Sequence, residues 1–126
     1  MTELERILHI DDQKGMLEIA RIALEIIGGF SLRSCSSGAE GLAQLDAFEP
    51  QLILLDVSMP GMDGPATLAR LRQLPAWADT PVVFTATRAQ EQDAQHLPGV
   101  VGMLIKPFDP MTLADQVNAI WLQGQT

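Results

Sequence analysis

Three carboxylates, a hydroxyl and an ammonium group stand where short apolar runs of the sequence end. Asp11-Asp12, Asp56, Thr85 and Lys106 each follow such a run directly. The acids offer only oxygen ligands, which favours Mg²⁺, with Mn²⁺ as an alternative, over Zn²⁺. Carboxylates held close together repel one another, so Lys106 and a divalent cation are expected to balance their charge. Because Mg²⁺ in proteins commonly binds phosphate oxygens too, the chemistry indicated is that of phosphate.

Taken one at a time, most of these residues have an ordinary structural explanation. Asp11 or Asp12 could cap a following helix, Thr85 fits a strand by propensity alone, and Lys106 could be a solvated charge. Asp56 is harder to explain as a cap, because Val-Ser-Met-Pro-Gly follows it and no helix begins there. Because polar residues directly follow four separate apolar runs, we favour the interpretation that they form one shared site.

The apolar runs predict the strands of a parallel sheet. Four of them are continuous, as is typical of strands covered on both faces: Ile7–Ile10, Leu52–Leu55, Val82–Phe84 and Val100–Ile105. Phe30–Cys35 alternates and predicts an edge strand. In open α/β sheets ligands bind outside the carboxyl ends of the strands, so the acids, Thr85 and Lys106 are expected at one edge.

Helical patterns separate the strands. Met16, Ile19, Ala20, Ala23 and Ile27 predict one face of a helix that ends at Gly28-Gly29. Three further helices have start signals, namely a capping box at Ser37–Glu40, a first-turn Pro65, and an N-cap at Asp109 followed by Pro110. A fourth segment, Ala89–Leu97, is short and polar. Five alternating βα units predict an α/β, doubly wound three-layer sandwich.

Composition restricts the possible partners. The 126 residues predict a single domain over 1–126 with no effector domain, and 16 acids against 8 bases give a net charge of −8. This charge disfavours binding to nucleic-acid backbones and anionic membrane surfaces. Cys35 is the single cysteine, and no signal peptide or membrane span is evident, so we expect a cytoplasmic protein.

The set of motifs resembles the receiver domain of the bacterial two-component response regulator family, the chemotaxis-regulator-like fold. The matching residues are Asp11-Asp12, Leu-Leu-Asp56 with the segment to Gly64, Thr85-Ala86, and Lys106-Pro107-Phe108. The resemblance covers essentially the whole chain. It implies a flavodoxin-like sheet with strand order 2-1-3-4-5.

The resemblance also implies a role for each site residue. Asp56 would accept a phosphoryl group from a phosphohistidine of a sensor kinase or phosphotransfer protein, forming an aspartyl phosphate. Lys106 would pair with a phosphoryl oxygen, and the Thr85 hydroxyl would move to bond another. The Mg²⁺ ligands would be Asp12, Asp56 and the Ser58 backbone carbonyl, with Asp11 acting through a metal-bound water. Such a protein is a signalling switch and not a general enzyme, because it catalyses only its own phosphorylation and slow self-dephosphorylation.

One position departs from the family pattern. Met103 stands where an aromatic switch residue is usual, and the chain has no Tyr. Ala86 is small and leaves room for movement of Thr85. The face formed by the fourth predicted helix, the fifth strand and the fifth helix is the expected contact for a downstream protein target or a weak homodimer of an otherwise monomeric chain.

Met103 and Pro98, which shortens the fourth predicted helix, motivate an alternative, an adaptor that uses the same fold without phosphorylation. A metal-dependent phosphohydrolase is disfavoured, because Ser58 stands where such enzymes usually carry a second acid. A flavin-binding protein is disfavoured too, since Asp11-Asp12 would repel the ligand phosphate.

Overall fold

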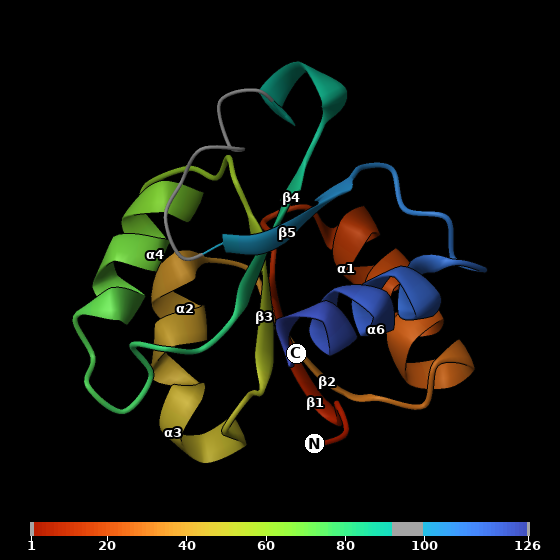
Figure 1. Ribbon diagram of the computed structural model, residues 1–126. Coiled ribbons are helices and arrows are strands. Elements are labelled where there is room, and N and C mark those ends of the chain that lie inside the picture. Colours follow the sequence, from red (N-terminus) through yellow and green to blue (C-terminus); the bar gives the residue numbers. More distant parts are fainter. Residues whose placement is uncertain (1, 92–99, 126) are drawn as a thin grey trace.

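The fold is a five-stranded parallel sheet with helices on both faces. The computed structural model describes residues 2–91 and 100–125. The strands are β1 (Arg6–Ile10), β2 (Ser31–Cys35), β3 (Leu52–Asp56), β4 (Val82–Ala86) and β5 (Val100–Ile105). Their order in the sheet is β2-β1-β3-β4-β5, and every neighbouring pair is parallel (Figure 1). The predicted doubly wound architecture and strand order are confirmed.

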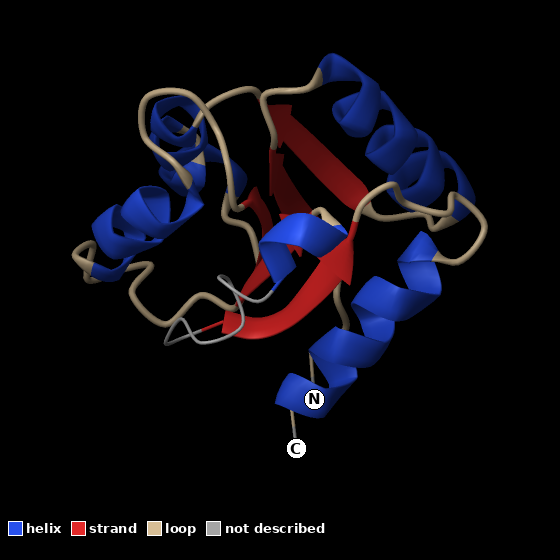
Figure 2. Cartoon of the chain, turned by 90° about the horizontal axis from the view of Figure 1, so that it is seen from above, coloured by secondary structure: helices blue, strands red, loops and turns tan. Residues whose placement is uncertain are grey.

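The helices form two layers around this sheet. The described ones are α1 (Lys14–Ala20), the π-helix η1 (Arg21–Ile27), α2 (Gly38–Ala43), α3 (Leu45–Phe48), α4 (Gly64–Arg72), the 3₁₀ helix η2 (Arg88–Gln90) and α6 (Leu113–Gly124). α1, η1 and α6 cover one face of the sheet, and α2, α3 and α4 cover the other (Figures 1 and 2). Among the described helices none has the length and apolar character needed to cross a membrane.

Alternation along the strands divides the core in two. Successive strand residues point to opposite faces, so Leu54 packs toward α6 whereas Leu55 packs toward α4. β3 and β4 lie inside the sheet and are buried along their whole lengths. This explains why their sequences are continuously apolar until the site residues are reached.

The first predicted helix changes its winding halfway. After Ala20 the chain forms η1, in which the Gly28 N–H bonds the Ala23 carbonyl five residues back at 3.0 Å. The wider turn shifts the buried face, so Leu24 is fully buried while Ile27 is 48% exposed. The expected burial of Ile27 was therefore wrong. Gly29 ends the segment with a positive φ of 76°, a conformation that glycine adopts without strain.

The start signals of the other helices have mixed outcomes. Ser37 caps α2, since its side chain accepts from the Glu40 N–H, and Pro65 lies in the first turn of α4 as expected. Asp109 does not cap α6, which begins only at Leu113. The Asp109 carboxylate instead accepts from the Met111 N–H at 3.0 Å and stabilises a turn before the helix.

The fourth helical segment predicted over Ala89–Leu97 is only partly described. Its beginning forms η2, and residues 92–99 lie outside the described residues.

Candidate functional site

β1 and β3 bring the predicted acids together. Ile10 pairs with Leu55 across the two strands, so Asp11 and Asp56 follow at the same level of the sheet edge. Carboxylate oxygens of Asp11, Asp12 and Asp56 lie within 4.8 Å of one another. Asp11 and Asp56 are buried and Asp12 is exposed, so the cluster opens to solvent on one side.

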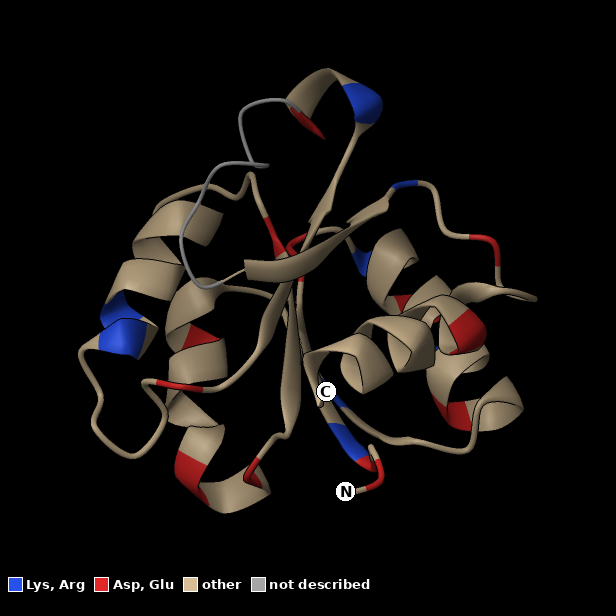
Figure 3. Ribbon diagram, viewed as in Figure 1, with Lys and Arg blue, Asp and Glu red and all other residues tan. Residues whose placement is uncertain are grey.

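Lys106 lies between the two buried acids. Its Nζ is 3.1 Å from Asp56 Oδ1 and 3.3 Å from Asp11 Oδ2, and the Lys106 side chain is only 8% exposed. Its backbone N–H donates to the Ala86 carbonyl at 2.8 Å, which fixes the end of β5 beside β4. Figure 3 shows acids at the carboxyl ends of β1 and β3 and a basic residue just after β5.

The positive charge near Asp56 is too small to compensate fully for ionisation of its carboxyl group. Burial and the neighbouring Asp11 raise the pKa of Asp56 to about 6, although the Ser58 N–H and Lys106 both oppose this shift. The Ser58 N–H donates to Asp56 Oδ1 at 3.2 Å. One cation therefore does not fully stabilise the ionised cluster, and a bound divalent cation would add the missing positive charge.

The donor set fits a hard cation. All three acids offer carboxylate oxygen and no His or Cys belongs to the described cluster, which suits Mg²⁺. Ser58 lines the same cavity as Asp12 and Asp56. The roles of these residues as metal ligands stay predictions.

The cavity above the acids holds about 490 Å³. Lys106, Thr87 and Gln90 line it together with Asp12 and Asp56. Thr87 and Gln90 were not singled out from the sequence. The signal that could have found Thr87 is its place directly after β4, two residues beyond a threonine that was chosen.

Thr85 lies beside Asp56 in the sheet, near the carboxyl end of β4. It pairs in register with Asp56, is fully buried, and its Oγ1 has no hydrogen-bond partner among the described residues. It does not line the cavity. Its β5 partner, Leu104, belongs to the core beneath α6. The switching role of Thr85 stays a prediction.

The other two predicted switch residues lie in the neighbouring strands. Ala86 is buried at the end of β4, and its carbonyl holds the Lys106 N–H. Met103 pairs with Phe84 and is partly buried against the core on the α4 side of the sheet. Met103 thus fills space under this face, but it carries no hydroxyl.

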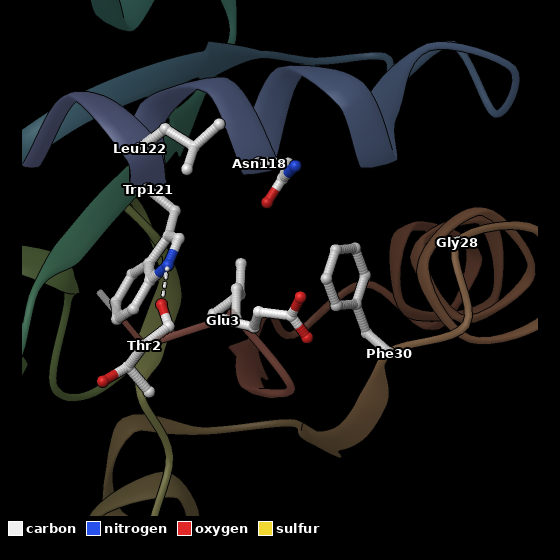
Figure 4. A pocket seen from close by; sticks show the side chains of 8 residues that line it. Thr2, Glu3, Gly28, Phe30, Asn118, Trp121 and Leu122 are labelled. Atoms are coloured by element: carbon white, nitrogen blue, oxygen red, sulfur yellow. Dashed lines mark hydrogen bonds between the residues drawn. The ribbon is translucent and has the colours of Figure 1, made fainter. Parts of the chain in front are cut away.

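A second cavity lies near the chain termini and contains none of the predicted site residues. It holds about 390 Å³ and is lined by side chains that include Phe30, Trp121 and Leu122 (Figure 4). The Trp121 indole N–H donates to the Thr2 carbonyl at 3.0 Å there.

A doubly wound parallel sheet with buried acids and a lysine at its carboxyl edge defines a receiver-type signalling domain. Residues 7–118 match the family model of the response regulator receiver domain. The chain belongs to this family, as its motifs predicted.

Curated relatives are about one-third identical to this chain over the aligned residues. The DNA-binding dual master transcriptional regulator RpaA of Synechocystis is 33% identical over 119 residues, which are 93% of this chain and 49% of that protein. Response regulator Rre1 of the same organism is 32% identical over 122 residues, covering 95% of this chain and 51% of that protein. The chain thus spans about half the length of these relatives.

Solved receiver structures superpose along nearly the full chain. The chemotaxis response regulator CheY4 of Vibrio cholerae matches with a TM-score of 0.82 at 25% identity, covering 93% of this chain and 98% of that one. A putative response regulator from Chloroflexus aurantiacus matches with a TM-score of 0.83 at 28% identity, covering 95% and 99%.

Proposed function

We propose that this receiver domain accepts a phosphoryl group on Asp56 and thereby switches its affinity for a partner protein. The observation that carries the proposal is the position of Asp56, which lies in the acidic cavity 3.1 Å from Lys106 Nζ. An ammonium group at this distance can bind an oxygen of a phosphoryl group carried by the same carboxylate. The family to which the chain belongs supports the assignment.

The proposed reaction is a direct transfer. An Asp56 carboxylate oxygen attacks phosphorus and forms a P–O bond while the P–N bond of a phosphohistidine breaks. The electron pair of that bond returns to the imidazole nitrogen. The histidine leaves as neutral imidazole when its other ring nitrogen carries a proton, and otherwise it takes a proton from solvent as the bond breaks. Lys106 offsets charge on the phosphoryl oxygens, because phosphoryl transfer depends mainly on positioning and charge neutralisation. Water later attacks the aspartyl phosphate, releasing inorganic phosphate and restoring the carboxylate.

Mg²⁺ is the cofactor that the cavity fits, with Asp12, Asp56 and the Ser58 carbonyl as ligands and Asp11 acting through a metal-bound water. When bound, this ion supplies positive charge that stabilises both the acid cluster and the phosphoryl oxygens. The burial of Asp11 against Lys106 suits an indirect role, since that carboxylate already has a partner.

The partners of such a switch are proteins. The phosphoryl donor would be a sensor histidine kinase or a histidine phosphotransfer protein, and the setting would be the cytoplasm. The receiver domain proposed over 1–126 would act on a downstream target through the face that includes β5 and α6, as a monomer or weak homodimer. Met103 lies on β5, packed on the α4 side of the sheet, and would transmit the change by repacking.

The direct test is phosphorylation by acetyl phosphate with Mg²⁺, followed by intact-mass measurement. The wild-type chain should gain one phosphoryl group, and Asp56→Asn should gain none. Asp115→Asn is the matched control, because it neutralises an exposed acid on α6 outside the cavity. Equal incorporation in Asp56→Asn and wild type would overturn the site, and no incorporation in wild type would overturn the function.

Met103 supports a second candidate function, an adaptor that binds its partner without phosphorylation. In that case a partner should bind with equal affinity to the free chain and to the chain carrying beryllofluoride, a mimic of the phosphoryl group. A large affinity difference between the two forms would exclude the adaptor.

A further inference from the structure

The cavity lined by Glu3, Phe30, Asn118 and Trp121, here called the Trp121 cavity, lies at the opposite edge of the sheet from the acidic site. Residues 2–4 precede β1 and Phe30 directly precedes β2, so this cavity borders the amino ends of the strands. Asp56 ends β3 at the carboxyl edge and lines the acidic cavity there. The two cavities are therefore separate, and each can hold its own ligand.

The Trp121 cavity contains one charged side chain. The Glu3 carboxylate points into the space bordered by Phe30, Asn118 and Trp121 (Figure 4). No Lys, Arg or His belongs to the lining, and among the residues that the structure describes none forms an ion pair with Glu3. A carboxylate without an internal counter-charge, on a chain with a net charge of −8, attracts a cationic group of a partner.

The other lining side chains suit a guanidinium group better than an ammonium group. A guanidinium is planar, stacks on aromatic rings and donates two parallel hydrogen bonds to a carboxylate, whereas an ammonium is a compact and strongly hydrated charge. The cavity offers the Phe30 ring for stacking, the Glu3 carboxylate for pairing and the Asn118 amide oxygen as a further acceptor.

The chain itself contains a guanidinium in similar surroundings. The Arg33 guanidinium carbon lies 4.9 Å from the centroid of the Phe48 ring, and the same guanidinium donates to the Gln44 side-chain oxygen. An arginine side chain in the Trp121 cavity would likewise meet an aromatic ring and an amide group, with the Glu3 carboxylate in addition. The expected contacts are therefore of a kind that this protein already forms.

Hydrogen bonds hold the segment that bears Glu3 in place. The Gln51 Nε2 donates to the Glu3 carbonyl at 2.9 Å, and the Gln51 Oε1 accepts from the Glu5 N–H at 2.7 Å. On the other side of Glu3, the Thr2 carbonyl accepts from the Trp121 indole N–H at 3.0 Å. The backbone of this wall is therefore fixed before a ligand binds, which lowers the entropy cost of binding.

An adjoining cavity extends the binding space beyond a single side chain. It holds about 550 Å³ and shares Glu3 and Phe30 with the Trp121 cavity. Its other charged residues, Glu5 and Arg6, pair with each other at 3.7 Å, and the Arg6 Nε also donates to the Glu49 carbonyl at 2.7 Å. This part of the groove has no second unpaired acid, so it suits the neutral backbone that flanks an arginine.

We propose that the Trp121 cavity binds an arginine side chain of a partner protein, with the flanking backbone of that protein lying across the adjoining cavity. Free arginine would fill only the first of the two cavities, whereas an extended segment that carries one arginine fits both. Because the site lies away from Asp56, this interaction does not depend on the proposed phosphorylation.

The test is a titration of the ¹⁵N-labelled full chain with blocked pentapeptides, followed by NMR through the Trp121 indole N–H resonance. The peptides are acetyl-Gly-Gly-Arg-Gly-Gly-amide and the same peptide with lysine or citrulline, which keeps the shape of arginine without its charge. The arginine peptide should shift the resonance saturably. The lysine peptide should bind severalfold more weakly, and the citrulline peptide about tenfold or more weakly. The indole of Trp77, the second tryptophan, lines neither cavity and should not shift.

Four variants locate the binding site. Glu3→Gln changes an exposed side chain and should weaken binding of the arginine peptide by about tenfold or more, as expected for loss of a hydrogen bond to a charged group. Phe30→Leu should weaken it severalfold through loss of stacking. Asp79→Asn is the matched control, because it removes the same charge from an exposed residue that lines neither cavity. Asp79→Asn and Asp56→Asn should both bind like wild type.

The possible outcomes decide between an arginine site and its alternatives. No shift of the Trp121 resonance with the arginine peptide, or equal affinity of wild type and Glu3→Gln, would overturn the inference. Equal affinity for the arginine and citrulline peptides would overturn it too, because the cavity would not recognise charge. If acetyl-arginine-amide binds as tightly as the pentapeptide, the site recognises a small guanidinium compound and the assignment to a partner protein is wrong.

Discussion

Asp56 must be ionised to act as a nucleophile, yet its surroundings favour the neutral form. Burial and Asp11 raise its pKa, and Lys106 is shared between the two acids, so neither carboxylate has a full counter-charge. The closeness of Asp11 and Asp56 disfavours ionisation of both carboxylates in the absence of metal. The same closeness favours binding of a cation between them. The protonation state of Asp56 is therefore determined by its burial and its charged neighbours more than by the ordinary pKa of an aspartate.

The residues of this cluster could be predicted because they interrupt continuously apolar runs. Asp56 is the only acid in a strand that is otherwise Leu and Ile, and Lys106 directly follows the last residue of β5. The surroundings of the Thr85 hydroxyl could not be predicted from the sequence. They depend on where β4 leaves the core: Thr85 is fully buried beside Asp56, whereas Thr87, just after the strand, is exposed.

His9 and Asp56 should produce opposite pH dependences of stability in metal-free buffer. Burial lowers the pKa of His9 to about 4, so the unfolded chain binds more protons than the native one and stability falls as pH drops below about 6.5. For Asp56, with a pKa near 6, the native chain binds more protons and stability falls as pH rises from about 4 to 6. Each contributes up to about 3 kcal/mol.

Urea unfolding across this pH range, in EDTA, separates the two contributions. His9→Leu should become less stable relative to wild type as pH rises through the Asp56 range, whereas Asp56→Asn should gain stability relative to wild type. If the free energy of unfolding changes with pH in parallel for wild type, His9→Leu and Asp56→Asn, neither group titrates as described.

Thr85→Val should stabilise the chain by about 1 kcal/mol. The valine keeps the shape of the side chain and removes a buried hydroxyl that has no partner among the described residues, so no hydrogen bond is lost. Chemical denaturation gives the free energy of unfolding. A loss of stability would mean that the hydroxyl is hydrogen-bonded in solution.

At the scale of elements, the hydrophobic pattern predicted the strands, whereas the helix ends were predicted only in part. A buried parallel strand needs a continuous apolar run, and each predicted run became a strand. The π-helical winding of η1 was not predictable, because the sequence of Arg21–Ile27 suits an ordinary helix and only packing against α6 and β2 decides which face is buried. Asp109 failed as a cap for a similar reason, since its side chain satisfied a nearer backbone N–H.

The start of α4 depends on a glycine that touches the end of β3. A Cβ at Gly64 would lie 2.5 Å from the Asp56 carbonyl oxygen and 2.7 Å from the Val57 Cα, and these backbone atoms cannot move away easily. Gly64→Ala should therefore destabilise the chain by roughly 2–3 kcal/mol and displace the loop that bears Ser58.

Gly15→Ala is the control for this prediction. Gly15 is exposed in α1 with nothing within 4 Å of its added Cβ, so the alanine should stabilise by about 1 kcal/mol through helix propensity. Thermal unfolding of both variants tests the contrast. Equal changes in stability for Gly64→Ala and Gly15→Ala would show that the backbone contacts at Gly64 do not restrict the side chain at this position.

Across the whole molecule, the acid surplus has two components. Of the 16 acids behind the net charge of −8, Asp11, Asp12 and Asp56 form a local cluster with one ammonium group, whereas most of the other described acids are exposed. Added salt screens the exposed acids, but only a cation bound between the carboxylates compensates the cluster. Ionic strength and Mg²⁺ should therefore act separately on stability.

Mg²⁺ should raise the melting temperature of the wild-type chain beyond the effect of sodium chloride at equal ionic strength. At a concentration of about 100 times the dissociation constant, binding to the native state alone adds about 2.7 kcal/mol, and each kcal/mol shifts the melting temperature by about 4 °C. Asp12→Asn removes a proposed ligand at an exposed position and should abolish most of the Mg²⁺ effect, while Asp115→Asn should keep it. If sodium and magnesium salts at equal ionic strength shift the wild-type melting temperature equally, the acids contribute only to surface repulsion and the cluster is not a metal site.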